Sequence, residues 1–161
     1  MLELVPDAVF FLGIEIGVEH ITATEIDLRA AIIRTRSEPF DGPAHGVEEA
    51  VRHAIALACS DLSPDRLERC EGIGISTPSQ LNLNGTIHSA PLLGWKNVNL
   101  IELVRQSLPF QIPLMVENDA NAAAWGEYRF GAGKGSDYLV AITVGTGIGG
   151  GIIIEGSMYR G

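Results

Sequence analysis

The amino-acid sequence predicts an α/β fold with a mixed sheet, in which an antiparallel three-strand meander is flanked by helices. Three observations lead to this prediction. Three extended stretches near the start are separated only by tight turns, helical and extended stretches then alternate, and a glycine-rich hairpin follows. The chain has 161 residues, of which 46% are hydrophobic, so it is long enough and apolar enough to bury a core.

The first part of the chain predicts the meander. Residues 1–9 form a lead-in or linker, and the domain itself starts at residue 10. Residues 10–16 are nearly all apolar, which indicates a central strand. Tight turns separate it from two further strands, predicted at residues 20–26 and 30–38. Strands joined by such short turns pair antiparallel.

Helices and strands then alternate. A helix is predicted over residues 47–59, where six apolar side chains share one face. A second, amphipathic helix is predicted over residues 98–108, with Leu100, Ile101, Val104 and Leu108 inward. The other predicted elements are a short connection at 63–70, a buried strand at 72–76, an Asn-Gly hairpin at 81–87, a strand at 112–116, an alanine-rich helix after it, and strands at 138–144 and 152–154.

Composition argues against several classes of protein. The net charge of −9 makes the chain itself a poor binder of nucleic acid, whose phosphates repel it. No stretch approaches the roughly 20 apolar residues of a membrane-spanning helix, and no basic segment of a signal peptide precedes Phe10. Cys59 and Cys70 lack a metal-binding spacing. They indicate reduced thiols in a cytoplasmic protein, with one disulfide as the open alternative.

The junction at residues 117–119 is the first candidate site. An extended run ends there and the alanine-rich helix begins, with Glu117, Asn118 and Asp119 in between. Asn118 or Asp119 would cap the helix, because both side chains accept hydrogen bonds from helical N–H groups. A carboxylate at a helix N-terminus also feels the positive end of the dipole, so Asp119 is a candidate to accept a proton. Spacing alone favours a simple cap.

The glycine-rich turn at residues 145–151 is the second candidate. Gly145, Gly147 and Gly150 satisfy Gly-x-Gly-x-x-Gly, but a dinucleotide-binding fingerprint needs a helix next, and a strand of isoleucines follows. No Gly-Lys-Ser/Thr follows either, which excludes a P-loop. Consecutive glycines still let backbone N–H groups close around a phosphate. A plain hairpin bend is an equal alternative.

Together, Glu-Asn-Asp-Ala-Asn at 117–121 and Gly-Thr-Gly-Ile-Gly-Gly-Gly at 145–151 resemble the ROK family of sugar kinases and sugar-responsive transcription repressors. The resemblance extends over residues 12–161. It implies an actin-like ATPase (ribonuclease H-like) half-domain, and it implies that Asp119 is the catalytic base that takes a proton from a sugar hydroxyl. The implied sugar contacts are Glu117, Asn118 and Asp119, and the implied phosphate contacts are Gly145, Thr146, Gly147 and Gly149.

The turn after the first strand departs from the kinases of that family, which carry Asp-x-Gly-Gly-Thr-Lys. Residues 15–20 are Glu-Ile-Gly-Val-Glu-His. Glu15 keeps a carboxylate that could coordinate magnesium. Val18 replaces a glycine, and its side chain keeps the backbone farther from a phosphate. Glu19 replaces the threonine and puts negative charge where a phosphate would lie. We therefore expect this turn to disfavour ATP.

The sugar side departs from the family as well. Residues 78–80 are Pro-Ser-Gln in place of the Pro-Gly-Pro that is common in the family. Leu92 replaces an asparagine that would donate or accept a hydrogen bond with the sugar. Trp95 is either a platform for a sugar ring or, as we favour, a tryptophan of the core or a hinge. The family has a second half-domain with a zinc motif and an adenosine pocket. The resemblance thus implies that residues 10–161 are the amino-terminal lobe of such a protein. The carboxy-terminal lobe, which carries the zinc motif, is expected to be absent from this chain.

Two functions are consistent with these features. The favoured one is the amino-terminal half of the sugar-sensing domain of a ROK-type transcriptional regulator. Val18, Glu19 and Leu92 depart from the kinase pattern, and the lead-in resembles the segment that joins the DNA-binding and sugar domains in the repressor branch. The alternative is a glucokinase-like sugar kinase that uses ATP and magnesium. For this chain we expect a sugar ligand and no cofactor. DNA would be bound only by a domain outside the chain, no membrane partner is expected, and the parent protein is expected to be a homo-oligomer.

Overall fold

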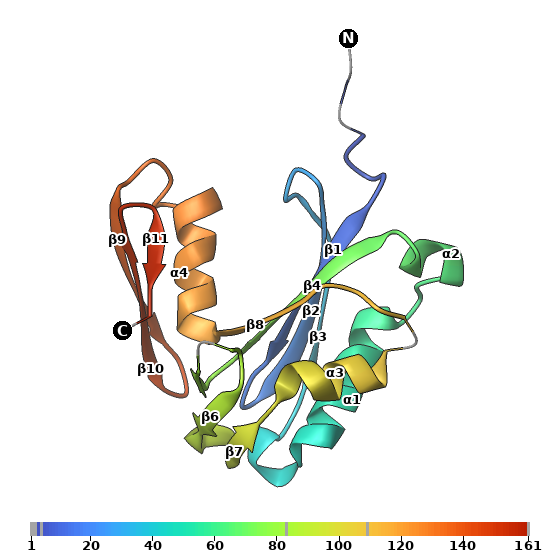
Figure 1. Ribbon diagram of the computed structural model, residues 1–161, viewed down its shortest axis with the longest axis horizontal. Coiled ribbons are helices and arrows are strands. Elements are labelled where there is room, and N and C mark those ends of the chain that lie inside the picture. Colours follow the sequence, from blue (N-terminus) through green and yellow to red (C-terminus); the bar gives the residue numbers. More distant parts are fainter. Residues whose placement is uncertain (1–2, 4, 83, 109, 161) are drawn as a thin grey trace. The chain divides into compact units, whose positions relative to one another are not determined.

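A five-stranded sheet organises the first part of the chain in the computed structural model, which describes residues 3, 5–82, 84–108 and 110–160. The strand order is β3-β2-β1-β4-β8 (Figure 1). The strands are β1 (Phe10–Ile16), β2 (His20–Asp27), β3 (Ile32–Pro39), β4 (Cys70–Thr77) and β8 (Leu114–Asn118). β1 pairs antiparallel with β2 and parallel with β4, and β2 pairs antiparallel with β3. The predicted mixed sheet with its antiparallel meander is confirmed.

Helices cover one face of this sheet. α1 (Val47–Cys59) packs against β1, β2 and α3 (Leu100–Ser107), and its bounds are those predicted from the sequence. α3 begins two residues later than predicted, because the Asn99 side chain caps it by accepting a hydrogen bond from the Glu102 N–H at 3.2 Å. Two short helical segments, η1 (Gly42–Ala44) and α2 (Pro64–Leu67), complete the connections.

A small second sheet follows β4. It consists of β5 (Gln80–Leu81), β6 (Ile87–Ala90) and β7 (Trp95–Val98), with a turn η2 (Pro91–Leu93) between the last two. The predicted Asn-Gly hairpin is confirmed: β5 and β6 are antiparallel, and Gly85 has the positive φ of 79° that favours glycine. The sequence analysis predicts no strand at β7, and it places Val98 at the start of the next helix.

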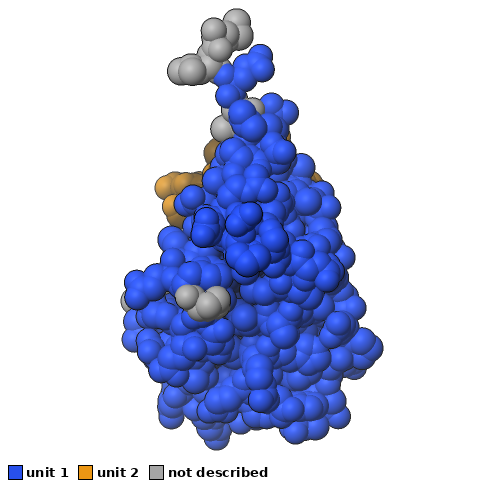
Figure 2. All heavy atoms as spheres, turned by 90° about the vertical axis from the view of Figure 1, so that its right-hand side faces the viewer, with its two compact units in different colours: residues 1–116 blue, residues 117–161 orange. Residues whose placement is uncertain are grey.

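The chain divides into two compact units, unit 1 (residues 1–116) and unit 2 (residues 117–161), coloured separately in Figure 2. In unit 2, helix α4 (Asp119–Phe130) packs on a three-stranded sheet of order β11-β10-β9. These strands are β9 (Tyr138–Val144), β10 (Ile148–Ile154) and β11 (Ser157–Tyr159), all antiparallel. That residues 10–161 form one lobe of a larger domain stays a prediction.

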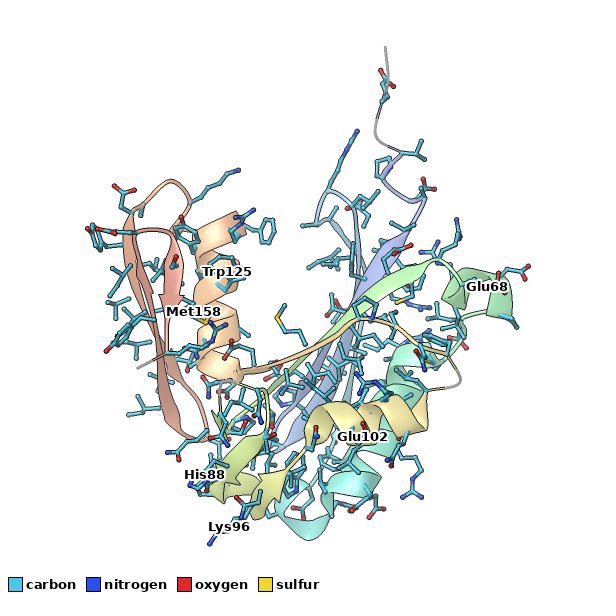
Figure 3. The ribbon with its side chains drawn as sticks, in the orientation of Figure 1. Glu68, His88, Lys96, Glu102, Trp125 and Met158 are labelled. Atoms are coloured by element: carbon cyan, nitrogen blue, oxygen red, sulfur yellow. The ribbon has the colours of Figure 1, made fainter. Side chains whose placement is uncertain are left out.

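The unit 2 sheet has two different faces. Ile153 and its neighbours on one face are buried against α4, and Figure 3 shows Met158 of β11 on that side. The other face, called the outer face below, is apolar and exposed, with exposed fractions from 37% to 82%. Its large side chains, which the antiparallel register places on one side, are Tyr138, Val140, Ile142, Val144, Ile148, Ile152, Ile154 and Tyr159. Among the described residues, no helix is long and apolar enough to cross a membrane.

Candidate functional site

The start of α4 places the two side chains that the sequence singles out. Asn118 has an extended backbone and caps the helix, since its Oδ1 accepts a hydrogen bond from the Asn121 N–H at 3.0 Å. Asp119 is the first residue of α4, half-buried, and its Oδ1 accepts from the Ala120 N–H at 2.8 Å. Of the two predicted caps, Asn118 is therefore the one that caps the helix. Asp119 lies at the positive end of the helix dipole.

Glu117 is held on both sides of its carboxylate. Its Oε1 accepts hydrogen bonds from the Asn118 N–H at 3.0 Å and from the Asn121 side-chain amide at 3.1 Å. Its Oε2 accepts from Nε and Nη2 of Arg160, at 3.1 and 2.7 Å. The sequence predicted Glu117 as a sugar contact, but it gave no sign of Arg160, because the two residues are 43 positions apart and meet only through tertiary structure.

The glycines of β10 lie directly against α4. A Cβ on Gly149 would be 2.7 Å from the Ala120 Cβ, and one on Gly151 would be 2.4 Å from the Ala124 Cβ. Real Cβ atoms do not approach other atoms so closely, so only glycine allows the helix and strand to pack at this distance. Gly149, predicted to contact phosphate, thus has a packing role in this unit.

The tip of the hairpin lies at the same end of unit 2 as Asp119. Gly149 is beside Ala120 and Gly151 is beside Ala124, so β10 and α4 run in the same direction, and the turn that precedes β10 is next to the helix N-terminus. At the tip Gly145, Thr146 and Gly147 are exposed, and the Gly145 N–H donates to the Gly147 carbonyl at 2.9 Å. The structure therefore brings the two predicted candidate sites together at one end of unit 2.

The first turn, in unit 1, is acidic. Glu15 is partly exposed, with its Oε1 3.6 Å from Nε2 of His20. Val18 and Glu19 line a surface pocket of about 500 Å³, together with Asp41. Within the described residues, no group of three or more His, Cys, Asp or Glu is placed to hold a metal ion. Glu15 belongs to no such group, and its expected role on magnesium stays a prediction.

The remaining predicted residues of unit 1 differ in exposure. Trp95 is 5% exposed and belongs to the core, which confirms the favoured interpretation. Leu92 is 42% exposed on η2, where an apolar side chain gives no hydrogen bond to a ligand. Cys59 and Cys70 are free thiols, and burial raises the pKa of both above the ordinary thiol value.

Comparisons with known proteins agree on one family. The sequence model of the ROK family matches residues 11–161. The glucokinase of Streptomyces coelicolor is 36% identical over 93% of this chain, and the xylose repressor of Caldicellulosiruptor bescii is 34% identical over all of it. The matches cover 45% and 40% of those two proteins.

A solved structure adds the fold. A ROK family glucokinase from Streptomyces griseus, crystallised with glucose and AMPPNP, is 38% identical and superposes with a TM-score of 0.80 over 94% of this chain and 46% of its own. The chain thus spans less than half the length of these relatives, and they include both kinases and repressors. Its fold is the α/β, actin-like ATPase type of those proteins, and the chain belongs to the ROK family.

Proposed function

We propose that this chain forms the amino-terminal half of the sugar-sensing domain of a ROK-type transcriptional regulator. The observation that carries the proposal is the acidic first turn, where Glu19 lines a pocket together with Asp41. Two carboxylates there repel a nucleotide phosphate, by about 1 kcal/mol for a pair of charges 4 Å apart in water and by more when desolvated. A regulator needs to bind a sugar and has no need of this phosphate contact.

The sugar contacts in this proposal come from the start of α4. Asp119 presents a carboxylate at the helix N-terminus, and Asn118 is beside it. A carboxylate accepts strong, charge-assisted hydrogen bonds from sugar hydroxyls. Leu92, exposed on η2, leaves fewer polar contacts for the sugar. Binding would then favour one of two conformations of the parent protein and so change its affinity for DNA, because coupling between two sites is reciprocal.

The experiment uses the full-length parent protein and labelled DNA from upstream of its gene. Fluorescence anisotropy is expected to show binding by the parent and none by the 161-residue chain, whose net charge is −9. Glucose or xylose, the sugars that give the relatives their names, is expected to weaken the complex. A parent protein with no DNA affinity at low salt contradicts the regulator.

A sugar kinase is the second candidate, favoured by one observation in particular. The exposed tip at 145–147 and Asp119 lie at the same end of unit 2. A kinase needs this arrangement, with the tip as the phosphate contact and Asp119 as the general base. In that reaction Asp119 takes the proton of a sugar hydroxyl, whose oxygen then bonds to the terminal phosphoryl group of ATP as ADP leaves. The kinase relatives support this candidate as well.

A coupled assay separates the two candidates. The full-length parent is mixed with ATP, magnesium and a panel of hexoses and N-acetylhexosamines. The regulator is expected to give no turnover above the blank. Turnover that Asp119→Ala abolishes would establish the kinase instead.

A further inference from the structure

We infer that Arg160 and Glu117 form a clamp that positions Asn118 and Asp119, so that Arg160 is a positioning residue of the sugar site. This inference rests on the proposed function in so far as Asn118 and Asp119 are the sugar contacts. It assigns Glu117 a supporting role in place of a direct sugar contact.

The geometry of the carboxylate is the first step. Glu117 is only 13% exposed, and each of its oxygens accepts two hydrogen bonds from this chain, so a sugar hydroxyl would have to displace one of them. The two bonds on Oε1 hold the Asn118 backbone and the Asn121 side chain. The two on Oε2 come from the Arg160 guanidinium, which also supplies the opposite charge.

The second step follows the bonds toward Asp119. Asn121 donates its backbone N–H to the Asn118 cap and its side-chain amide to Glu117, so one residue ties the cap to the clamp. Asp119 is between Asn118 and Ala120 in this bonded turn, and Arg160 follows the last residue of β11. The clamp thus fixes the first turn of α4 to the end of the sheet within unit 2.

The test has a structural arm that needs no ligand. Hydrogen exchange followed by NMR on the 161-residue chain compares Arg160→Gln and Arg160→Lys with the original. We expect faster exchange of the Asn118 and Asn121 backbone amides in Arg160→Gln. In Arg160→Lys we expect exchange rates between those of Arg160→Gln and the original, because the ammonium keeps the positive charge but cannot donate the two parallel hydrogen bonds of the guanidinium. Arg129→Gln is the matched control, because this substitution removes the same charge from the same unit. The Arg129 guanidinium lies 5.7 Å from the centre of the Trp125 ring.

The binding arm uses the full-length parent and calorimetric titration with glucose and with xylose. For the sugar that binds, Arg160→Gln is expected to weaken affinity by about three- to tenfold, as for a partly exposed ion pair with charge-assisted bonds, while Arg129→Gln leaves it unchanged. The midpoint of urea unfolding should stay near the original in both variants.

The outcomes separate the clamp from the proposed function. Unchanged exchange at Asn118 and Asn121 in Arg160→Gln overturns the clamp, whatever the sugar titration shows. Faster exchange throughout unit 2, with a lower unfolding midpoint, also overturns it, because Arg160 would then support the fold in general. Faster local exchange with unchanged sugar affinity overturns the link to the site. A parent protein that binds neither sugar contradicts the proposed function, while the exchange result on the clamp still stands.

Discussion

Asn118 and Asp119 have separate roles at the start of α4, although they are adjacent. Asn118 makes the cap, and Asp119 carries the charge at the helix N-terminus. The structure therefore separates a contribution to stability from a candidate contribution to binding. Substitutions at the two positions are expected to have different effects.

The first prediction concerns Asp119→Asn in the full-length parent. The amide keeps the size of the side chain but loses the negative charge, so its hydrogen bonds to sugar hydroxyls are weaker. We expect sugar affinity to fall by about tenfold or more, since a hydrogen bond to a charged group contributes roughly 1.5–3 kcal/mol. Calorimetric titration measures this, with Asp137→Asn, on an exposed loop of unit 2, as the control. Equal losses in both variants would contradict a specific role.

The second prediction concerns the thiols. Burial raises the pKa of Cys59 and Cys70 in the folded chain, so the unfolded chain releases these protons at lower pH. Their contribution to stability is therefore complete below the thiol pKa of the unfolded state and is lost as pH rises through the folded-state values. Urea unfolding at a series of alkaline pH values should show a steeper loss in the original chain than in a Cys59→Ala, Cys70→Ala variant. Parallel curves would refute the prediction.

At the scale of elements, α4 and β10 show how small residues set a packing distance. Alanines at positions 120 and 124 face glycines at positions 149 and 151, and a Cβ on either glycine would come within 2.7 Å of the facing methyl group. The glycine-rich sequence at 145–151 is thus partly explained by packing. Gly145, at the exposed tip, has no such contact to explain it, since a Cβ there would meet no atom within 4 Å.

The third prediction compares two neighbouring glycines. Gly151→Ala puts a Cβ 2.4 Å from the Ala124 Cβ and 2.7 Å from the Ala120 carbonyl oxygen, and we expect a loss of about 1–3 kcal/mol in the free energy of unfolding of unit 2. Gly150→Ala points to the other face, where the nearest atom would be 3.7 Å away, and should change little. Urea unfolding followed by the fluorescence of Trp125, on α4 in Figure 3, measures both. A Gly150→Ala loss as large as that of Gly151→Ala would argue against the packing role.

The sequence predicts elements best where one periodicity dominates. The 13 residues of α1 repeat apolar positions at helical spacing, so both of its ends were predicted. β7 was missed because Trp95 and Val98 are its only apolar residues and two exposed polar residues separate them. β11 was not predicted either, since its three residues include one serine and give no alternation to detect.

The candidate site could be predicted only in part. The junction at Asn118 and Asp119 was visible because a strand sequence changes there to a helix sequence. The bond from Arg160 to Glu117 depends on how β11 returns to the start of α4, which no local pattern encodes. Spacing also could not tell a glycine needed for packing, such as Gly151, from one needed for a turn.

At the scale of the whole molecule, the outer face of unit 2 is the least expected feature. Strands covered on both faces have continuous apolar sequences, and β9 has one, Tyr-Leu-Val-Ala-Ile-Thr-Val. α4 covers only one of its faces. Contiguous apolar surface of this kind is unusual on a monomer.

The fourth prediction tests that surface with a fluorescent probe of apolar patches. The 161-residue chain is expected to bind anilinonaphthalene sulfonate in its folded state, and Ile142→Lys should reduce the signal because it puts a charge in the middle of the outer face. Ile32→Lys is the control, since Ile32 and Ile142 are both 70% exposed and only Ile142 is on this face. Equal reductions in the two variants would show that the outer face is not the binding surface.

Two edge strands of this chain differ in how they would meet another extended segment. β3, at the end of the unit 1 sheet, carries Arg34, Arg36 and Glu38 and ends at Pro39, and such residues hinder the addition of a further strand. β9, at the end of the unit 2 sheet, has neither a charge nor a proline. During refolding at high concentration, aggregation is therefore expected to nucleate at β9, and a lysine introduced there should raise the yield of soluble protein more than the same change in β3.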